Sequence, residues 1–297
     1  MKVPCIKVGD DDATIVGFEV EQMILPALSG LHVPRFIATG DFRRQPCIVM
    51  ERIEGESLKP RFDAALIGID EVLQIGVKVA TAWHDLHRQH VIHLDVKPSN
   101  IMFRPVVEVN GKAAGGEAVR VGFCLSRHDH LPNLLGEEFE LPAGTGPYLS
   151  PEQVQFARND PRSDLFALGV MRYHLVTGQR PFGAPTSVCG LRQRLYRDPL
   201  PPRTLRPDCP PRLQEIMLRC LEVQPERRHQ SAAQLAFDLQ RPDQMVRTKR
   251  ALRATHRGGL KVMRRWFSAL GAETRLLEAM RSACCTPNPA RAWPASQ

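Results

Sequence analysis

Long apolar runs are missing from this sequence. Its 297 residues contain no stretch of about 18 consecutive apolar residues, so we expect no membrane-spanning helix. Residues 1–12 lack the apolar segment of a secretory signal peptide. The eight cysteines include no C-x-x-C pair, and only Cys284 and Cys285 are close together in the sequence. Without an export signal, this pattern predicts reduced thiols and a cytoplasmic protein.

Acidic residues are scarce in one part of the chain only. The net charge is +8, and residues 241–297 contain twelve Lys and Arg against three Asp and Glu, so residues 1–240 are almost neutral. Apolar residues separate the charges of this basic tail, and Gly258-Gly259 interrupts any single long helix. Two interpretations stay open: an arm that binds an anionic partner (lipid, nucleic acid or an acidic protein), or a linker that packs on the preceding lobe. The proline-containing end from residue 284 predicts partial disorder.

One stretch, VIHLDVKPSNIM at 91–102, carries the strongest chemical pattern. It places a carboxylate, a lysine and an amide at fixed offsets: Asp95, Lys97 and Asn100. A carboxylate can orient a hydroxyl nucleophile and accept its proton, and a lysine beside it can neutralise charge on a phosphoryl group. An asparagine oxygen can bind Mg²⁺. The alternative interpretation is a polar turn without a catalytic role.

These residues resemble the catalytic loop H-x-D-x-K-P-x-N of protein kinases, with five matching positions in eight residues. The resemblance implies ATP and Mg²⁺ as cofactors, a protein as substrate or binding partner, and Asp95, Lys97 and Asn100 as catalytic residues. It also implies that Asn100 is a metal ligand.

Segments before this loop resemble the nucleotide-binding half of a kinase. The run VPCIKV at 3–8 resembles the V-A-I-K strand, so Lys7 is expected to hold the inner phosphates of ATP. Apolar residues at helical spacing predict a helix over 18–28. In the family a glutamate of that helix pairs with the strand lysine. Glu21 is the better match, and Glu19 is the alternative.

A buried strand is predicted to run into a linker at 46–55, where the family binds adenine. By this resemblance Met50 is the gatekeeper, and Glu51 to Ile53 form the hinge. Met102, on the strand that follows the catalytic loop, is expected to complete the nucleotide site. A helix is predicted over 71–90, leading into the loop.

Three further segments resemble the second lobe of a kinase. GTGPYLSPE at 144–152 resembles the substrate-docking segment and makes Thr145 a catalytic-site residue, while RSDLFALG at 162–169 resembles the central buried helix, whose aspartate braces the catalytic loop. QPERR at 224–228 resembles D-P-x-x-R, so Arg228 is expected to pair with Glu152. The set predicts an α+β, bilobal protein-kinase-like fold, of bacterial serine/threonine type, with a truncated β-rich N-lobe and a mainly helical C-lobe. The predicted parts are a partial N-lobe and hinge at 1–54, a C-lobe at 55–240 and the basic tail at 241–297.

Two departures from the family pattern affect the chemistry. No glycine-rich loop precedes the lysine strand, so we expect either an internal start of the chain or a nucleotide site without its roof. Where D-F-G is expected, the sequence reads Gly122-Phe123-Cys124, and glycine has no carboxylate for Mg²⁺. We therefore expect both ATP and Mg²⁺ binding to be weak or lost, and phosphoryl transfer to be impaired.

Lys97 and Thr145 form the serine/threonine-kinase arrangement, so the inherited substrate is a Ser or Thr hydroxyl. Leu94 replaces the arginine that often receives an activation-loop phosphate, and between Gly122 and Gly144 only Ser126 has a hydroxyl to phosphorylate. We expect no switch by loop phosphorylation. Three functions stay open: an impaired serine/threonine kinase, a pseudokinase that acts as a binding or scaffold protein, and a role led by the basic tail.

Overall fold

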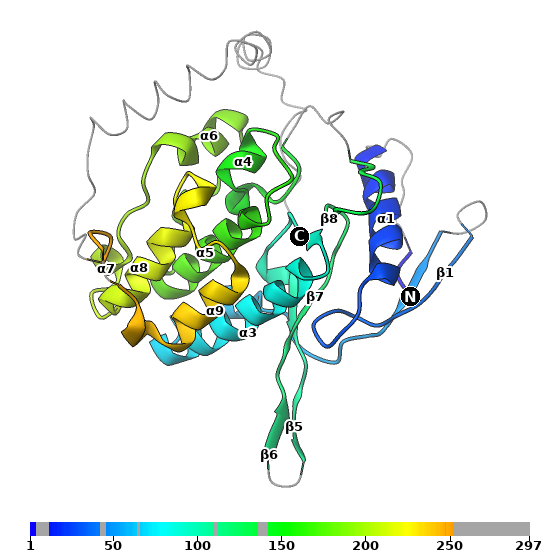
Figure 1. Ribbon diagram of the computed structural model, residues 1–297, viewed down its shortest axis with the longest axis horizontal. Helices are drawn as coiled ribbons and strands as arrows, with labels where there is room; N and C mark the ends of the chain where they lie inside the picture. Colours follow the sequence, from blue (N-terminus) through cyan, green and yellow to red (C-terminus); the bar gives the residue numbers. More distant parts are fainter. Residues whose placement is uncertain are drawn as a thin grey trace.

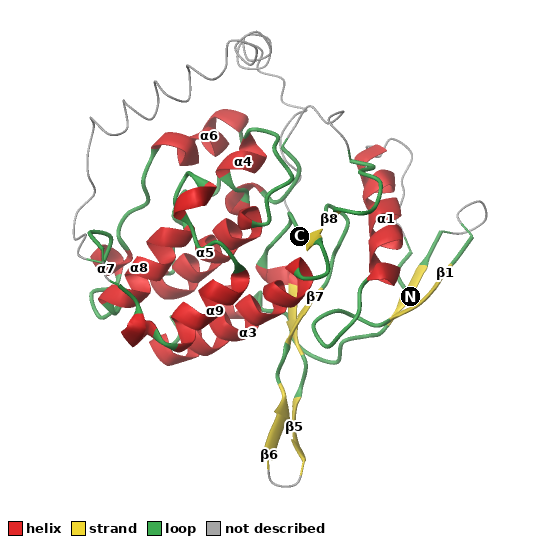
Figure 2. Ribbon diagram, in the orientation of Figure 1, coloured by secondary structure: helices red, strands yellow, loops and turns green. Residues whose placement is uncertain are grey.

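The computed structural model of the chain describes residues 1–3, 12–41, 46–63, 66–109, 112–135, 142–246 and 248–251. Figure 1 shows a large helical lobe beside a smaller lobe that contains the N-terminus, and Figure 2 shows the strands gathered in the small lobe and between the lobes. This arrangement agrees with the two-lobed α+β fold predicted from the sequence.

The small lobe consists of one helix beside a short antiparallel sheet. Its elements are α1 (Asp12–Ile24), the 3-10 helix η1 (Leu25–Ala27), β1 (Phe36–Thr39) and β2 (Ile48–Met50). Lys2 forms an isolated bridge to Ile48 on the other side of β2. The buried residues of α1 recur at helical spacing, and they include Phe18, Val20 and Ile24. Pro26, in η1, marks the end of the α-helix.

The helical lobe is built around α5 (Arg162–Thr177), which is buried along almost its whole length. It packs against α3 (Ile69–His87) and α8 (Pro211–Cys220), and α9 (Ala232–Gln240) lies along α3. The left-handed conformation of Gly178, at φ +70°, ends α5 because glycine adopts it without a Cβ clash. The remaining helices are α2 (Pro60–Asp63), α4 (Pro151–Val154), α6 (Val188–Tyr196), α7 (Pro202–Leu205) and the 3-10 helices η2 (Pro98–Asn100), η3 (Gly146–Tyr148), η4 (Pro225–Arg227) and η5 (Pro242–Gln244).

Short antiparallel strand pairs frame the catalytic-loop segment. They are β3 (Val91–Ile92) with β8 (Arg127–His128), and β4 (Ile101–Phe103) with β7 (Ala118–Arg120). A third pair, β5 (Val106–Val109) with β6 (Lys112–Gly115), forms a hairpin that projects from the body in Figure 1. Because β3 and β4 flank residues 93–100, this segment is anchored at both ends.

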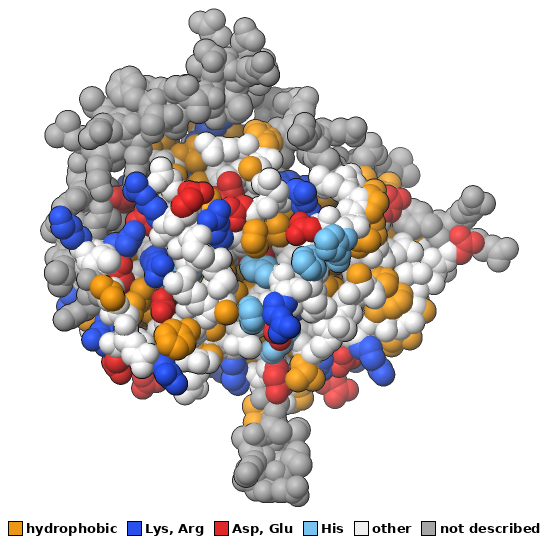
Figure 3. All heavy atoms as spheres, in the orientation of Figure 1, with side chains coloured by type: hydrophobic (Ala, Val, Ile, Leu, Met, Phe, Trp, Pro, Cys, Tyr) orange, Lys and Arg blue, Asp and Glu red, His pale blue; other side chains and the backbone are white. Residues whose placement is uncertain are grey.

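The first residues of the basic tail pack on the helical lobe. Thr248 donates its hydroxyl to the buried Glu215 of α8 at 2.8 Å, and Ala251 is completely buried. Residues 252–297, on which most of the tail prediction rests, lie outside the described residues. On the face seen in Figure 3, basic and acidic side chains are interspersed over the helical lobe. Among the described residues no helix is long and apolar enough to cross a membrane.

Candidate active site

Asp95 is the centre of the candidate site. Its Oδ1 accepts hydrogen bonds from the Thr145 hydroxyl at 2.6 Å and from the Thr145 backbone N–H at 3.1 Å. Its Oδ2 lies 2.9 Å from Lys97 Nζ and accepts from Asn100 Nδ2 at 3.1 Å. Burial alone would raise the pKa of Asp95, but the Lys97 charge and the Thr145 hydroxyl outweigh it, so the pKa lies below its ordinary value. The structure thus brings together the four residues predicted for catalysis around an ionised carboxylate.

The backbone before Asp95 is held in a strained conformation. Leu94 has φ +61°, a value that branched side chains rarely adopt. The buried carboxylate of Asp164, in α5, accepts from the backbone N–H groups of His93 and Leu94, both at 2.9 Å. Gln153 Nε2 donates to the Leu94 carbonyl at 2.8 Å. Asp164 therefore braces the loop as the sequence predicted, whereas Gln153 was not foreseen.

Gly122 lies directly beside Asn100. It has φ +77°, and a Cβ built on it would lie 3.1 Å from Asn100 Oδ1. The Asn100 amide nitrogen donates to both the backbone and the side chain of Asp95, which leaves Oδ1 as the oxygen available to a cation. The described part of the chain contains no group of three or more His, Cys, Asp and Glu side chains that could hold a metal ion. This donor set does not fit Mg²⁺, because a Mg²⁺ site in a kinase uses carboxylate oxygens.

Glu21 is buried and lies between a lysine and a cysteine. Its Oε2 forms an ion pair with Lys2 Nζ and accepts from Cys124 Sγ at 2.8 Å. Lys7, the predicted partner, lies outside the described residues. Lys2 was not predicted as a partner of Glu21, although it directly precedes the β-prone run at 3–8. Cys124 was not predicted either, because no local pattern connects it to α1.

The predicted hinge connects the two lobes. Met50 ends β2, Ile53 is buried, and Met102 forms an isolated bridge with Ser57 just after the linker. Glu51 pairs with Arg104, the residue that follows β4. The Arg104 bond, the largest contribution, lowers the pKa of the Glu51 carboxyl below its ordinary value. The Glu51–Arg104 pair therefore joins the linker to the residue just after β4, the strand that follows the catalytic loop.

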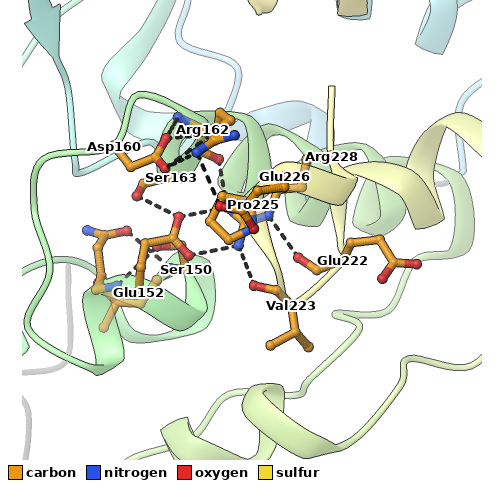
Figure 4. A network of polar contacts seen from close by, with 12 residues as sticks. Ser150, Glu152, Asp160, Arg162, Ser163, Glu222, Val223, Pro225, Glu226 and Arg228 are labelled. Atoms are coloured by element: carbon orange, nitrogen blue, oxygen red, sulfur yellow. Dashed lines mark hydrogen bonds and ion pairs between the residues drawn. The ribbon is translucent and has the colours of Figure 1, made fainter. Parts of the chain in front are cut away.

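Phe123 packs against α1, and the Glu152–Arg228 pair predicted from the sequence is present. Phe123 is completely buried, packs in the cluster that contains Val20 and Ile24 of α1, and lies 5.4 Å from the His93 ring. Arg228 donates to both carboxylate oxygens of Glu152, at 2.6 and 2.7 Å, in the network of Figure 4. The Glu152–Arg228 pair is structural, because it is a buried ion pair that joins α4 to the residue after η4.

Comparison with known proteins supports the same assignment. The sequence profile described as "Protein kinase domain" matches residues 10–238. A probable serine/threonine-protein kinase of Clostridium perfringens is 28% identical over 225 residues, which are 75% of this chain and 31% of the relative. The serine/threonine-protein kinase PknB of Mycolicibacterium smegmatis is 32% identical over 196 residues, which are 65% of this chain and 30% of the relative. The chain spans about a third of the length of these curated relatives.

The fold has a counterpart among solved structures. The crystal structure of the PknI kinase domain of Mycobacterium tuberculosis superposes with a TM-score of 0.55 at 23% sequence identity, covering 79% of this chain and 80% of that one. At this identity the superposition shows the fold alone, while the profile match covers well over half of the chain. The chain belongs to the protein kinase family, and the two relatives named above are bacterial serine/threonine kinases.

Proposed function

We propose that this chain binds ATP in the inherited kinase site and transfers its phosphoryl group to protein Ser or Thr hydroxyls only weakly. The observation that carries the proposal is Gly122, which places no carboxylate beside Asn100. The family generally uses ATP with Mg²⁺. Here the ion would have one neutral side-chain oxygen at this point instead of a charged ligand.

The remaining machinery supports retained nucleotide binding. Lys2 has a partly exposed side chain, and the buried Glu21 holds its ammonium group beside the hinge strand β2. In this proposal Lys2 contacts the inner phosphates, and the backbone of Glu51 to Ile53 contacts the adenine. Lys7 stays a second candidate for the phosphate contact.

Asp95 is suited to orient a hydroxyl nucleophile and accept its proton. Its carboxylate is ionised, and Lys97 and Thr145 fix its position. Lys97 is placed to neutralise charge on the transferred group. Losing one preorganised electrostatic contact costs on the order of 10²- to 10³-fold in rate, and we expect the missing carboxylate to cost at least that.

The second candidate is a pseudokinase that acts as a binding or scaffold protein. The satisfied state of Asp95 favours it, because both carboxylate oxygens already accept from Thr145, Lys97 and Asn100. A substrate hydroxyl would have to displace one of these donors. We also propose a cytoplasmic location and an anionic partner for the basic tail.

Phosphoryl transfer from γ-labelled ATP tests the choice. We would compare the full chain with Asp95→Asn, using autophosphorylation and a mixed Ser/Thr peptide set. The impaired-kinase proposal expects slow labelling that Asp95→Asn abolishes. Equal labelling of the two proteins would remove phosphoryl transfer from the proposed function and leave the pseudokinase. Rapid labelling by the unmodified chain would show that the site is not impaired.

A further inference from the structure

Cys124 contacts helix α1 at two places one turn apart. Gly17 lies against it so closely that a Cβ on Gly17 would be 3.2 Å from the Cys124 carbonyl oxygen and 3.3 Å from its Cβ. Four residues later on the same helix, Glu21 accepts a hydrogen bond from Cys124 Sγ at 2.8 Å. Residues four apart share one helix face, so Cys124 fixes both the distance and the rotation of α1.

The Cys124 thiol and the Lys2 ammonium share one oxygen of Glu21. Both contact Oε2, and Lys2 Nζ lies 3.5 Å from Cys124 Sγ. The Glu21 side chain is only 2% exposed, whereas that of Lys2 is 39% exposed. A buried carboxylate that loses its donors is strongly disfavoured, whereas a lysine with a partly exposed side chain can exchange partners at a smaller cost.

We propose that Cys124 is a positioning residue, whose S–H bond keeps Glu21 and α1 in place while Lys2 turns its ammonium towards a nucleotide phosphate. The inference rests on the proposed function, in that Lys2 is taken as the phosphate contact. It goes beyond that function because it assigns a role to the residue after Phe123.

The state of the thiol agrees with a donor role. Burial raises the pKa of Cys124 to about 12, the Glu21 charge adds to the rise, and Lys2 opposes it. The thiol therefore stays protonated near neutral pH and donates to Glu21. Serine could replace it as a donor of similar size, whereas alanine could not.

The first experiment measures the affinity of the full chain for a fluorescent ATP analogue. We expect Cys124→Ala to weaken binding about tenfold, since a hydrogen bond to a charged group is lost, and Cys124→Ser to recover most of the loss. Cys209→Ala, a change at a buried thiol just before α8 in the helical lobe, is the matched control and should leave affinity unchanged. In a Glu21→Gln background, Cys124→Ala should change affinity less than about twofold, because the charged acceptor of the Cys124 S–H group is already gone. An unchanged affinity of Cys124→Ala, or an equal loss in both backgrounds, would overturn the proposal.

The second experiment needs no nucleotide and separates this inference from the proposed function. Alkylation of Cys124 by iodoacetamide is followed by peptide mass spectrometry in the folded chain. Glu21→Gln should speed alkylation about fivefold or more, because it removes the charge that holds the proton on the thiol, whereas Lys2→Met should not speed it. If the unmodified chain binds no nucleotide, the proposed function fails, and the alkylation result alone decides the role of Cys124. An alkylation rate that Glu21→Gln leaves unchanged would overturn it.

Discussion

The missing side chain of Gly122 would point at Asn100: its Cβ position is 3.1 Å from the Asn100 side-chain oxygen. The backbone therefore still places residue 122 beside the asparagine of the catalytic loop, although no carboxylate is there. The positive φ of +77° is tolerated by Asp and Asn better than by most other residues. This geometry makes the loss of metal binding testable by a single substitution.

Gly122→Asp should tighten ATP binding in the presence of Mg²⁺ by about tenfold or more, because it adds a charged oxygen ligand beside Asn100. It should cost about 1–2 kcal/mol of stability, since a Cβ is forced into the left-handed region against a close neighbour. Calorimetric titration with and without Mg²⁺ measures the first effect, and urea unfolding measures the second.

Gly122→Asn is the control for that substitution, because it adds a side chain of the same shape without the charge. It should show the same stability loss and no gain in Mg²⁺-dependent affinity. If the two variants gain affinity equally, the missing charge is not what weakens metal binding.

Breaking the Glu152–Arg228 pair should cost about 3–5 kcal/mol, because it leaves a buried charge without its partner. Arg228 is completely buried and also donates to the backbone carbonyls of Arg162, Glu222 and Val223. We expect Arg228→Met to lower the free energy of unfolding by that amount in urea. Arg212→Ala, which breaks a pair with the 94% exposed Asp243, should cost less than about 1 kcal/mol. Equal losses from the two changes would contradict the structural role of the buried pair.

Acid should destabilise the fold through Asp164. Burial alone would raise the pKa of this carboxyl, but the hydrogen bond and charge of His87 and the contacts with His93 lower it below its ordinary value. A carboxylate with a depressed folded pKa stabilises the fold above its unfolded pKa of about 4, and this stability is lost as the pH falls further. Compared with the unmodified chain, Asp164→Asn should therefore have a lower free energy of unfolding at pH 7. It should lose less of that free energy between about pH 5 and 3.

Urea unfolding at several pH values measures this dependence. An acid loss in Asp164→Asn as steep as in the unmodified chain would show that another group carries it. Asp95 and Asp160 are the alternatives, because their pKa values are also depressed against the effect of burial.

Phosphorylation of Ser126 should not activate the chain. The side chain is only 4% exposed, and its hydroxyl donates to the His93 carbonyl at 3.1 Å. A charge at this position would have to leave the buried site and break that contact. Ser126→Asp should lower the melting temperature more than Ser126→Ala, which loses about 1 kcal/mol for the hydrogen bond. A phosphoserine at 126 that raises phosphoryl transfer would disprove this prediction.

The sequence predicted most where the contacts are local. Asp95, Lys97 and Asn100 lie within six residues, so their convergence could be predicted from their spacing. The Asp164 brace and the Glu152–Arg228 pair join distant residues, and only the family resemblance made them predictable. The two-lobed fold followed from the same resemblance.

Long-range contacts particular to this chain could not be predicted. Cys124 is 103 residues from Glu21, and no periodicity links a loop thiol to a helix carboxylate. The assignment of Lys7 rested on the local pattern of one strand. Lys2 lies earlier in the chain and reaches Glu21 because its backbone pairs with Ile48, which is a tertiary contact.

The central claim is that the nucleotide site has lost its main charged ligand for Mg²⁺. The most direct test is the affinity of the full chain for ATP, measured by calorimetry in excess Mg²⁺ and again in EDTA. We predict that the two dissociation constants differ by less than about threefold, which corresponds to less than about 1 kcal/mol. An affinity at least about thirtyfold tighter with Mg²⁺, lost again in Asn100→Ala, would contradict the claim.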